Sequence, residues 1–150
     1  MHPKIMEQAI PAFGVRSETL PVKTRACAYA VVTNAEGLVA AVNESHGLHL
    51  PGGGIELSET PIEAIHREVL EEVGCRVILG QRIGQAMQYF VSDGQCQALY
   101  ATFYAGEFGE KIAQTHEHEL RWVRPEDLFH AHHAWAARKR LATQLEASHK

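Results

Sequence analysis

The sequence has no excess of positive charge, few cysteines and no long hydrophobic run, and each absence excludes a class of protein. A formal net charge of −4 over 150 residues gives no sign of the basic face that duplex nucleic acid requires. The three cysteines, Cys27, Cys75 and Cys96, are odd in number and form no CxxC pair, which predicts free thiols in a reducing compartment. Without a leader pattern over residues 1–23 or an apolar run of membrane length, we expect a cytoplasmic protein without a membrane span.

The length and composition predict one folded domain. A content of 45% hydrophobic and 21% charged residues is ordinary for a globular protein, and a chain of this length usually forms a single domain. We therefore expect residues 1–150 to form one domain. Residues 1–24 mix prolines with charges, so we expect them to form an irregular arm or a short hairpin packed on that domain.

A run of glycines precedes the most informative part of the chain. Gly52–Gly54 follows Pro51 directly. Glycine adopts positive φ angles and lets the backbone approach a ligand without interference from a Cβ atom. The run therefore predicts a loop suited to phosphate groups.

A helix with clear ends follows this run. Thr60 can act as N-cap, Pro61 occupies the first helical position, and Glu63 lies where it closes a capping box. Gly74 provides the usual C-terminal stop. On a helical wheel, one arc of the helix is apolar and should face the core. The arc consists of Ile62, Ile65, Val69 and Val73, and Leu70 lies at its edge.

Three carboxylates share another face of the same helix. Glu68, Glu71 and Glu72 are spaced so that their side chains are neighbours. Like charges at this spacing repel each other unless a cation lies among them. Mg²⁺ prefers carboxylate oxygens, water and substrate phosphates as ligands. The pattern therefore predicts a site for Mg²⁺, with Mn²⁺ as a substitute.

The spacing of these residues resembles a known family motif. The pattern Gly-x5-Glu-x7-Arg-Glu-U-x-Glu-Glu-x-Gly-U, with U apolar, is the Nudix box of MutT-like hydrolases. The sequence matches each specified position, with a small apolar cysteine at the last: Gly53, Glu59, Arg67, Glu68, Val69, Glu71, Glu72, Gly74 and Cys75. The predicted passage from loop to helix is the context that such a motif needs.

The resemblance implies a fold and a reaction. The fold is the Nudix-type α/β/α sandwich, an α/β architecture with a mixed sheet between helices. The reaction is metal-dependent hydrolysis of a diphosphate linkage in a nucleoside diphosphate linked to another moiety, by attack of water on phosphorus. We expect a nucleotide-type small molecule as the partner, neither duplex nucleic acid nor a membrane, with a homodimer left open.

Residue roles follow by position in the motif. The resemblance assigns metal binding to Glu68, Glu71 and Glu72, and catalysis to Glu71 and Glu72 together with a general base. That base can be a box glutamate or one from a later loop, where Glu117 and Glu119 are the candidates. We favour Glu117, because it lies in the loop just before a strand-like Leu-Arg-Trp-Val segment; a solvated charged loop is the alternative.

The other box residues are expected to bind substrate or to support the site. Gly52–Gly54 and Arg67 are the candidates for contact with the substrate phosphates. Arg67 has a second interpretation, which we favour: projecting away from the metal face, it holds Glu59 or Glu56 and fixes the loop against the helix. The rigid fork of arginine suits either partner.

The rest of the chain predicts further strands and a second helix. The expected elements are a hairpin of residues 25–32 and 38–42, a short strand at 48–50, an antiparallel pair at 76–91 and 95–105, a strand at 119–123, a helical turn at 125–128 and an amphipathic helix at 133–147. This order is typical of a mixed sheet with helices on its faces.

Other interpretations stay open or are disfavoured. A zinc site at His130, His132 and His133 is disfavoured, because no cysteine lies nearby to complete it. Most aromatic side chains should be in the core, with one or two lining the substrate pocket and stacking on a base; the candidates are Tyr89, Phe90, Tyr100, Phe103 and Trp122.

Two alternatives to an enzyme can be stated. A non-catalytic Nudix-like nucleotide-binding or sensor domain is expected to have lost box acids, but each of them stands here. A protein-interaction face would leave the carboxylates solvated and gain no stability from Mg²⁺. Nucleoside triphosphates, ADP-ribose, nucleotide sugars and dinucleoside polyphosphates all remain open as substrates.

Overall fold

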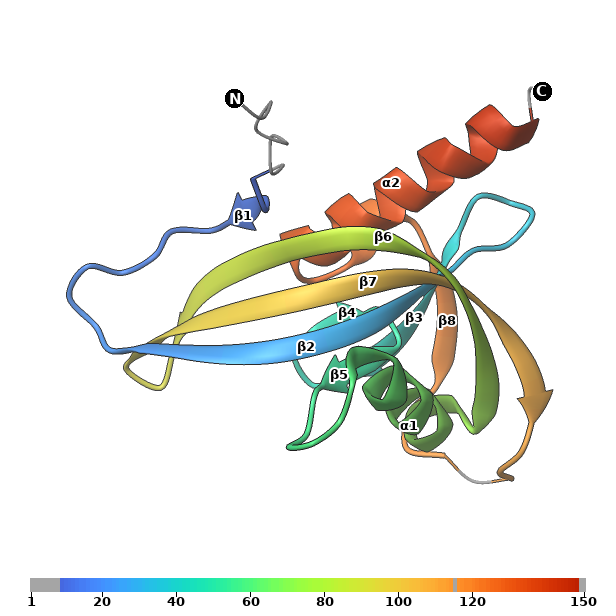
Figure 1. Ribbon diagram of the computed structural model, residues 1–150, viewed down its shortest axis with the longest axis horizontal. Helices are drawn as coiled ribbons and strands as arrows, with labels where there is room; N and C mark the ends of the chain where they lie inside the picture. Colours follow the sequence, from blue (N-terminus) through green and yellow to red (C-terminus); the bar gives the residue numbers. More distant parts are fainter. Residues whose placement is uncertain (1–8, 115, 149–150) are drawn as a thin grey trace, which may run out of the picture.

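The computed structural model describes residues 9–114 and 116–148 (Figure 1). Within these residues the strands form two sheets. The larger has the order β1 (Ala12–Phe13), β6 (Cys75–Ser92), β7 (Gln95–Lys111), β2 (Val22–Val32) and β5 (Gly52–Gly54). The smaller has the order β4 (Gly47–His49), β3 (Val39–Glu44) and β8 (Leu120–Val123). Parallel pairing of β1 with β6 and of β2 with β7, beside antiparallel neighbours, makes the larger sheet mixed.

Two helices lie on opposite sides of the strands. In Figure 1, α2 (Ala131–Ser148) runs along one side of the larger sheet and α1 (Pro61–Val73) lies on the other. Alternation along β2 produces this arrangement, because successive side chains of a strand point to opposite faces. Tyr29 and Val31 enter the core on the α2 side, whereas Ala28 and Ala30 enter the core on the α1 side. The predicted α/β fold, with a mixed sheet and helices on its two faces, is confirmed.

The ends of α1 are as predicted. The side chain of Thr60 accepts a hydrogen bond from the backbone N–H of Glu63, and the Glu63 side chain accepts one from Thr60 in return. Gly74 caps the C-terminus in the left-handed conformation. The apolar stripe is narrower than expected: Ile62 is 43% exposed, because the sheet covers only the side of the helix that carries the later apolar residues.

The long hairpin of β6 and β7 is confirmed, and so are β8 and a 3-10 turn at Pro125–Asp127. The hairpin expected from residues 25–32 and 38–42 is wrong. Both strands exist, but β2 pairs with β7 and β5, whereas β3 pairs with β4 and β8. Only an isolated bridge between Thr33 and Val39 joins them. A turn does form between the two strands, with the Gly37 N–H donating to the Asn34 carbonyl at 3.2 Å, but it carries the chain from one sheet to the other.

Two further details bear on the predictions. Of the expected arm, the described residues contain β1, which pairs with β6 rather than forming a hairpin of its own; residues 1–8 lie outside the described part. Within that part, no helix combines the length and the apolar character needed to cross a membrane.

Candidate active site

The glycine run forms the floor of the candidate site, but as a strand rather than a loop. Gly52–Gly54 is β5, antiparallel to β2. A Cβ atom at Gly53 would lie 2.9 Å from the carboxyl carbon of Glu68, and one at Gly54 would collide with the guanidinium of Arg25. At Gly52, where φ is +141°, a Cβ would strike the carbonyl oxygen of Ala28. The glycines therefore allow close approach by protein side chains and backbone, a need that the sequence pattern alone did not distinguish from phosphate binding.

Glu72 is the buried acid of the site. It comes from the last turn of α1, is only 2% exposed, and accepts a hydrogen bond of 2.9 Å from the backbone N–H of Gly52. Burial raises the pKa of this carboxyl to about 9; the Gly52 N–H opposes the shift, and the charges of Glu68, Glu44 and Glu117 add to it. A group in this environment binds a positive charge readily, either as a proton or as a cation.

Glu68 and Glu71 lie beside it with less burial. One oxygen of Glu68 is 2.8 Å from Nη1 of Arg67. Burial raises the pKa of Glu68, and Arg67 counteracts this. The Glu71 side chain is nearly half exposed, with its carboxylate 3.6 Å from the same arginine nitrogen. The three helix carboxylates therefore share one side of α1, as expected, although their burial differs widely.

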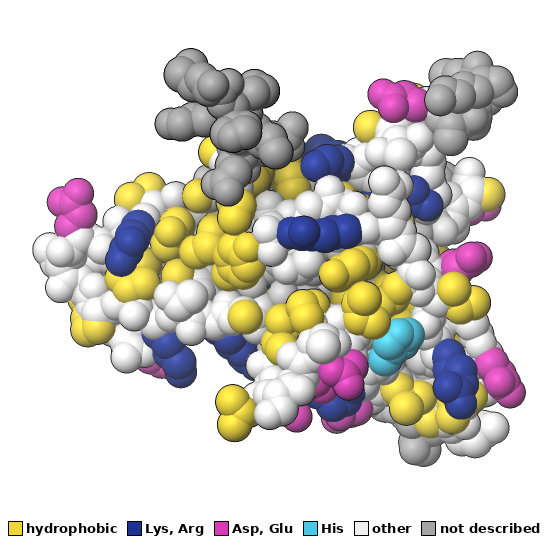
Figure 2. Space-filling model, viewed as in Figure 1, with side chains coloured by type: hydrophobic (Ala, Val, Ile, Leu, Met, Phe, Trp, Pro, Cys, Tyr) yellow, Lys and Arg dark blue, Asp and Glu magenta, His cyan; other side chains and the backbone are white. Residues whose placement is uncertain are grey.

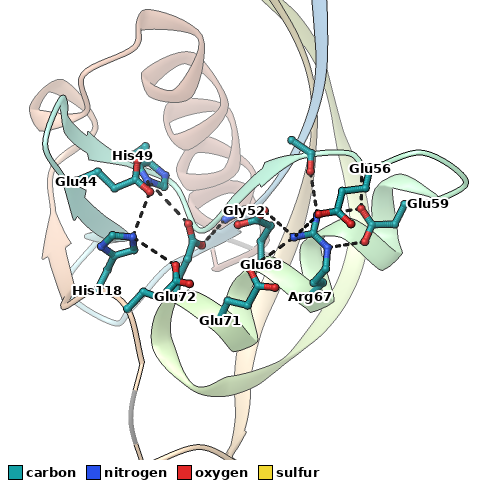
Figure 3. A network of polar contacts seen from close by, with 12 residues as sticks. Glu44, His49, Gly52, Glu56, Glu59, Arg67, Glu68, Glu71, Glu72 and His118 are labelled. Atoms are coloured by element: carbon teal, nitrogen blue, oxygen red, sulfur yellow. Dashed lines mark hydrogen bonds and ion pairs between the residues drawn. The ribbon is translucent and has the colours of Figure 1, made fainter.

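Arg67 is held by several acceptors (Figure 3). Its Nε and Nη2 donate to the two carboxylate oxygens of Glu59 at 2.6 and 2.9 Å, and Nη2 also donates to the carbonyl of Gly54 at 3.0 Å. This bidentate pair lowers the pKa of Glu59 to about 2. The contact with Glu59 is the predicted one. The expectation that Arg67 projects away from the metal face is wrong, because its third nitrogen reaches Glu68.

The loop before β8 docks on the end of α1. The backbone N–H of Glu117 donates to the carbonyl of Glu71 at 3.1 Å, and that of His118 donates to the carbonyl of Glu72 at 3.0 Å. These bonds satisfy carbonyls that the end of a helix leaves without intrahelical partners. They bring the exposed Glu117 carboxylate close enough to raise the pKa of both Glu68 and Glu72. Glu119 is also exposed.

Three residues that the sequence did not single out complete the acid cluster: Glu44, His49 and His118. His49 of β4 places its Nε2 at 3.2 Å from Glu44 of β3 and at 3.9 Å from Glu72. His118 approaches the same Glu44 oxygen at 3.3 Å (Figure 3). The sequence offered a partial signal: in the expected short strand, alternation puts His49 on the face opposite Leu48 and Leu50. Which residues His49 meets there depends on the pairing of β4 with β3.

A cavity of about 360 Å³ opens beside these groups. The acids Glu44, Glu68 and Glu72 and the glycines of β5 line one part of it. Another part is lined by Arg25, Tyr29, Leu99, Phe129 and His130. The aromatic residues expected at the pocket do not line this cavity; Phe103, for example, is fully buried in the core. The aromatic side chains that do line it are Tyr29 and Phe129.

Two of the three C-terminal histidines, His132 and His133, are part of the core, whereas His130 lines the cavity. His132 and His133 are fully buried, and Nδ1 of His133 accepts a hydrogen bond from the backbone N–H of Leu50. Burial lowers the pKa of His132 to about 3 and that of His133 well below its usual range. Among the described residues, the group whose ligand atoms converge is instead Glu44, His49 and Glu72.

The chain is similar to a known family of proteins. The NUDIX domain model matches residues 23–145. The chain is 33% identical over 124 residues to an RNA pyrophosphohydrolase of Bartonella tribocorum, covering 65% of this chain and 69% of that one. It is 29% identical over 119 residues to an RNA pyrophosphohydrolase of Rhodopseudomonas palustris, covering 63% and 66%. The chain thus spans about two thirds of the length of these relatives.

Solved structures agree on the fold. A MutT protein from Methanosarcina mazei Go1 superposes with a TM-score of 0.61 at 24% identity, covering 85% of this chain and 98% of that one. A NUDIX hydrolase from Nitrosomonas europaea gives 0.67 at 19% identity, covering 81% and 90%. At these identities the likeness concerns the fold alone.

Proposed function

The chain belongs to the Nudix family of pyrophosphohydrolases, and from this premise we propose that it hydrolyses a diphosphate linkage in a nucleotide-type substrate with the help of Mg²⁺ or Mn²⁺. The observation that carries the proposal is the position of Glu72. A carboxylate 2% exposed lies among other carboxylates and beside a cavity. Such a group costs free energy to charge unless a cation joins it.

Glu68, Glu71 and Glu72 are the residues that would hold this cation. Their oxygens are the hard donors that Mg²⁺ and Mn²⁺ prefer, and the missing Cβ of Gly53 leaves room for the Glu68 carboxylate. The donor set therefore fits the ion that the family uses. When bound, the ion neutralises a diphosphate and lowers the pKa of water close to neutral values.

Other groups of the chain hold these carboxylates in position. The Gly52 N–H fixes one oxygen of Glu72, so the other oxygen remains available to the site. Arg67 positions Glu68; its bonds to Glu59 and Gly54 occupy it, which favours positioning over direct contact with phosphate. Positioned groups of this kind reduce the reorganisation needed for reaction.

Glu117 is our candidate for the general base. Glu71 and Glu72 are the other two carboxylates to which we assign a catalytic role. The exposed carboxylate of Glu117 takes a proton from the attacking water, whose oxygen forms a bond to phosphorus while the bridging P–O bond breaks. The electron pair of that bond leaves with the departing phosphate or nucleotide. The backbone hydrogen bonds of residues 117 and 118 to α1 support this role, because they hold the loop that carries Glu117 against the end of the helix.

The 5′-phosphorylated end of an RNA is the first substrate to test, because the relatives are named for RNA pyrophosphohydrolysis. A cavity of about 360 Å³ with Arg25 and Phe129 at its wall has the size and chemistry for a single nucleotide. On the face shown in Figure 2, basic and acidic side chains are interspersed rather than gathered into a basic stripe, which favours recognition of a chain end over a duplex.

A release assay tests this proposal. The substrate panel would contain 5′-triphosphorylated RNA, nucleoside triphosphates, ADP-ribose, a nucleotide sugar and a dinucleoside polyphosphate, each with Mg²⁺ and with Mn²⁺. We expect cation-dependent cleavage of a P–O–P bond, with RNA the preferred substrate. Turnover unaffected by EDTA would contradict the metal assignment, and better cleavage of a free nucleotide than of RNA would contradict the substrate.

A further inference from the structure

Glu44, His49 and Glu72 come together from three different elements beside the carboxylates of α1. Glu44 ends β3, His49 ends β4 and Glu72 lies in the last turn of α1. One ligand atom from each lies within 4.8 Å of the others, with His49 Nε2 at 3.2 Å from Glu44 Oε1 and 3.9 Å from Glu72 Oε2. Two ligands of one transition-metal ion, each at ~2.1 Å from it, are separated by at most ~4.2 Å. Both nitrogen–oxygen distances therefore fit a single ion.

The ring of His49 is already oriented as a metal ligand. Its Nδ1 lies 2.7 Å from the carbonyl oxygen of Leu50, and a carbonyl can only accept, so Nδ1 carries the proton of the neutral ring. The lone pair of Nε2 then faces two carboxylates, and this atom is buried without a hydrogen-bond partner among the described residues. Metal-binding histidines are held in the same way, with the second ring nitrogen donating to a carbonyl or a carboxylate.

Nε2 and the two carboxylates thus turn electron-pair donors toward one point, and a cation at that point would be a partner for all three. The carboxylates are also fixed for this purpose: Oε1 of Glu72 accepts from Gly52, so Oε2 is the oxygen turned to His49. Glu44 is oriented by His118, which approaches its Oε1 at 3.3 Å. Figure 3 shows these groups converging at one end of α1, away from Arg67.

We propose that Glu44, His49 and Glu72 form a second cation site that shares Glu72 with the carboxylate site and prefers borderline ions such as Zn²⁺ or Co²⁺ to Mg²⁺. The imidazole nitrogen sets this preference, because nitrogen ligands suit Zn²⁺ and its neighbours, whereas Mg²⁺ takes oxygen ligands. The site goes beyond the proposed hydrolysis, and its occupancy can be measured without substrate.

The test is a titration of the whole chain with Co²⁺ and Zn²⁺. With Mg²⁺ in large excess to occupy the carboxylate site, the wild type should bind one Co²⁺ with visible absorption bands and without a thiolate charge-transfer band, and Zn²⁺ should displace it. Loss of a residue that only orients a ligand costs ~10–100-fold in affinity, so His49→Gln should lose at least ~100-fold for both ions. Its affinity for Mg²⁺ should change less than ~3-fold, because Glu68 and Glu71 remain.

Two further variants keep the test decisive. His46→Gln removes a histidine that lines the same cavity but is outside the converging group, and it should bind Co²⁺ and Zn²⁺ as the wild type does. Glu44→Gln removes a more exposed ligand, so it should fold even if His49→Gln does not, and it should weaken both ions by at least ~10-fold.

Equal Zn²⁺ affinity in wild type and His49→Gln, equal loss in His46→Gln, or no Co²⁺ binding to the wild type would overturn the second site. None of these results affects Mg²⁺-dependent hydrolysis. Conversely, a wild type that hydrolyses none of the substrates could still give the Co²⁺ spectrum. Failure of the second site and failure of the proposed function can therefore be told apart.

Discussion

The two ends of the acidic face of α1 differ in the groups that compensate the charge of the carboxylates. At one end, Arg67 lies among Glu59, Glu68 and Glu71 and supplies a positive charge from the protein itself. At the other end, Glu72 is more deeply buried, and the groups of the described residues that can donate to it are a backbone N–H and an imidazole. The pKa values follow: about 2 for Glu59 and about 9 for Glu72. A carboxylate that the protein leaves without compensation marks the place where a cation belongs.

The largest expected effect comes from removing the uncompensated charge. Glu72→Gln keeps the shape of the side chain and should lower kcat by at least ~100-fold, as loss of an electrostatic contribution does. The fold should persist, because a neutral amide avoids the cost of a buried charge. Steady-state kinetics with Mg²⁺ and a thermal melt check both points. Near-normal turnover in a folded variant would remove Glu72 from the site.

A methyl group added to the glycine strand should displace the carboxylate of Glu68, at the end of the acidic face that carries Arg67. Gly53→Ala places a Cβ 2.9 Å from the Glu68 carboxyl carbon, which must shift. Misplacement by about 1 Å can cost ~100-fold in rate, so we expect a loss between ~10-fold and ~100-fold in kcat. Gly80→Ala is the control, since its Cβ would meet only an ordinary contact at 3.7 Å. Equal activity of the two variants would show that Glu68 does not need its observed position.

Replacing the protein's own cation should have a smaller effect. Arg67→Lys keeps the charge but loses the bidentate contact with Glu59 and the bond to Gly54. We expect a ~10-fold loss of kcat through displacement of Glu68 and a loss of ~1 kcal/mol in the free energy of unfolding for this partly exposed group. Denaturant titration and kinetics measure these. An unchanged KM would support positioning; a KM raised with kcat unchanged would instead indicate phosphate binding.

The pH dependence of stability should be opposite at the two ends in metal-free protein. The raised pKa of Glu72 means that the folded state holds a proton between pH ~4.5 and ~9 that the unfolded state has lost, so this group's contribution falls as pH rises, by at most ~1.4 kcal/mol per pH unit. The lowered pKa of Glu59 gives a contribution present above pH ~4.5 and lost as pH falls toward ~2.

Denaturant titrations in EDTA across this range test the signs. Glu72→Gln should flatten the decline on the alkaline side, and Glu59→Gln should remove the loss on the acid side. Stabilisation by Mg²⁺ should grow as pH rises, because the ion competes with a proton for Glu72. A Mg²⁺ effect independent of pH would contradict the exchange of proton for cation.

What the sequence predicted well is local. The Thr60 cap, the capping box and the Gly74 stop depend on residues a few positions apart, and the same is true of the carboxylates on one helix face. Pairing of strands is not local: β2 joins β7 in parallel across about half the length of the chain, and no turn signal can report that. The expected hairpin therefore failed although its two strands exist.

The same distinction applies to the site. Glu68, Glu71 and Glu72 could be placed because one helix carries them. Glu44 and His49 could not, because they reach Glu72 only after two strands of the smaller sheet pair. The burial of each carboxylate could not be predicted from the sequence either. The side chains of the three helix glutamates range from almost fully buried to nearly half exposed.

Paramagnetic broadening tests most directly whether the carboxylates of α1 hold a divalent cation beside the glycine strand. Mn²⁺ added to ¹⁵N-labelled protein should broaden the amide signals of Gly52–Gly54 first and leave those near Gly80 sharp, and Glu68→Gln should weaken the effect strongly. Broadening that begins elsewhere, or that is the same in wild type and Glu68→Gln, would contradict the account.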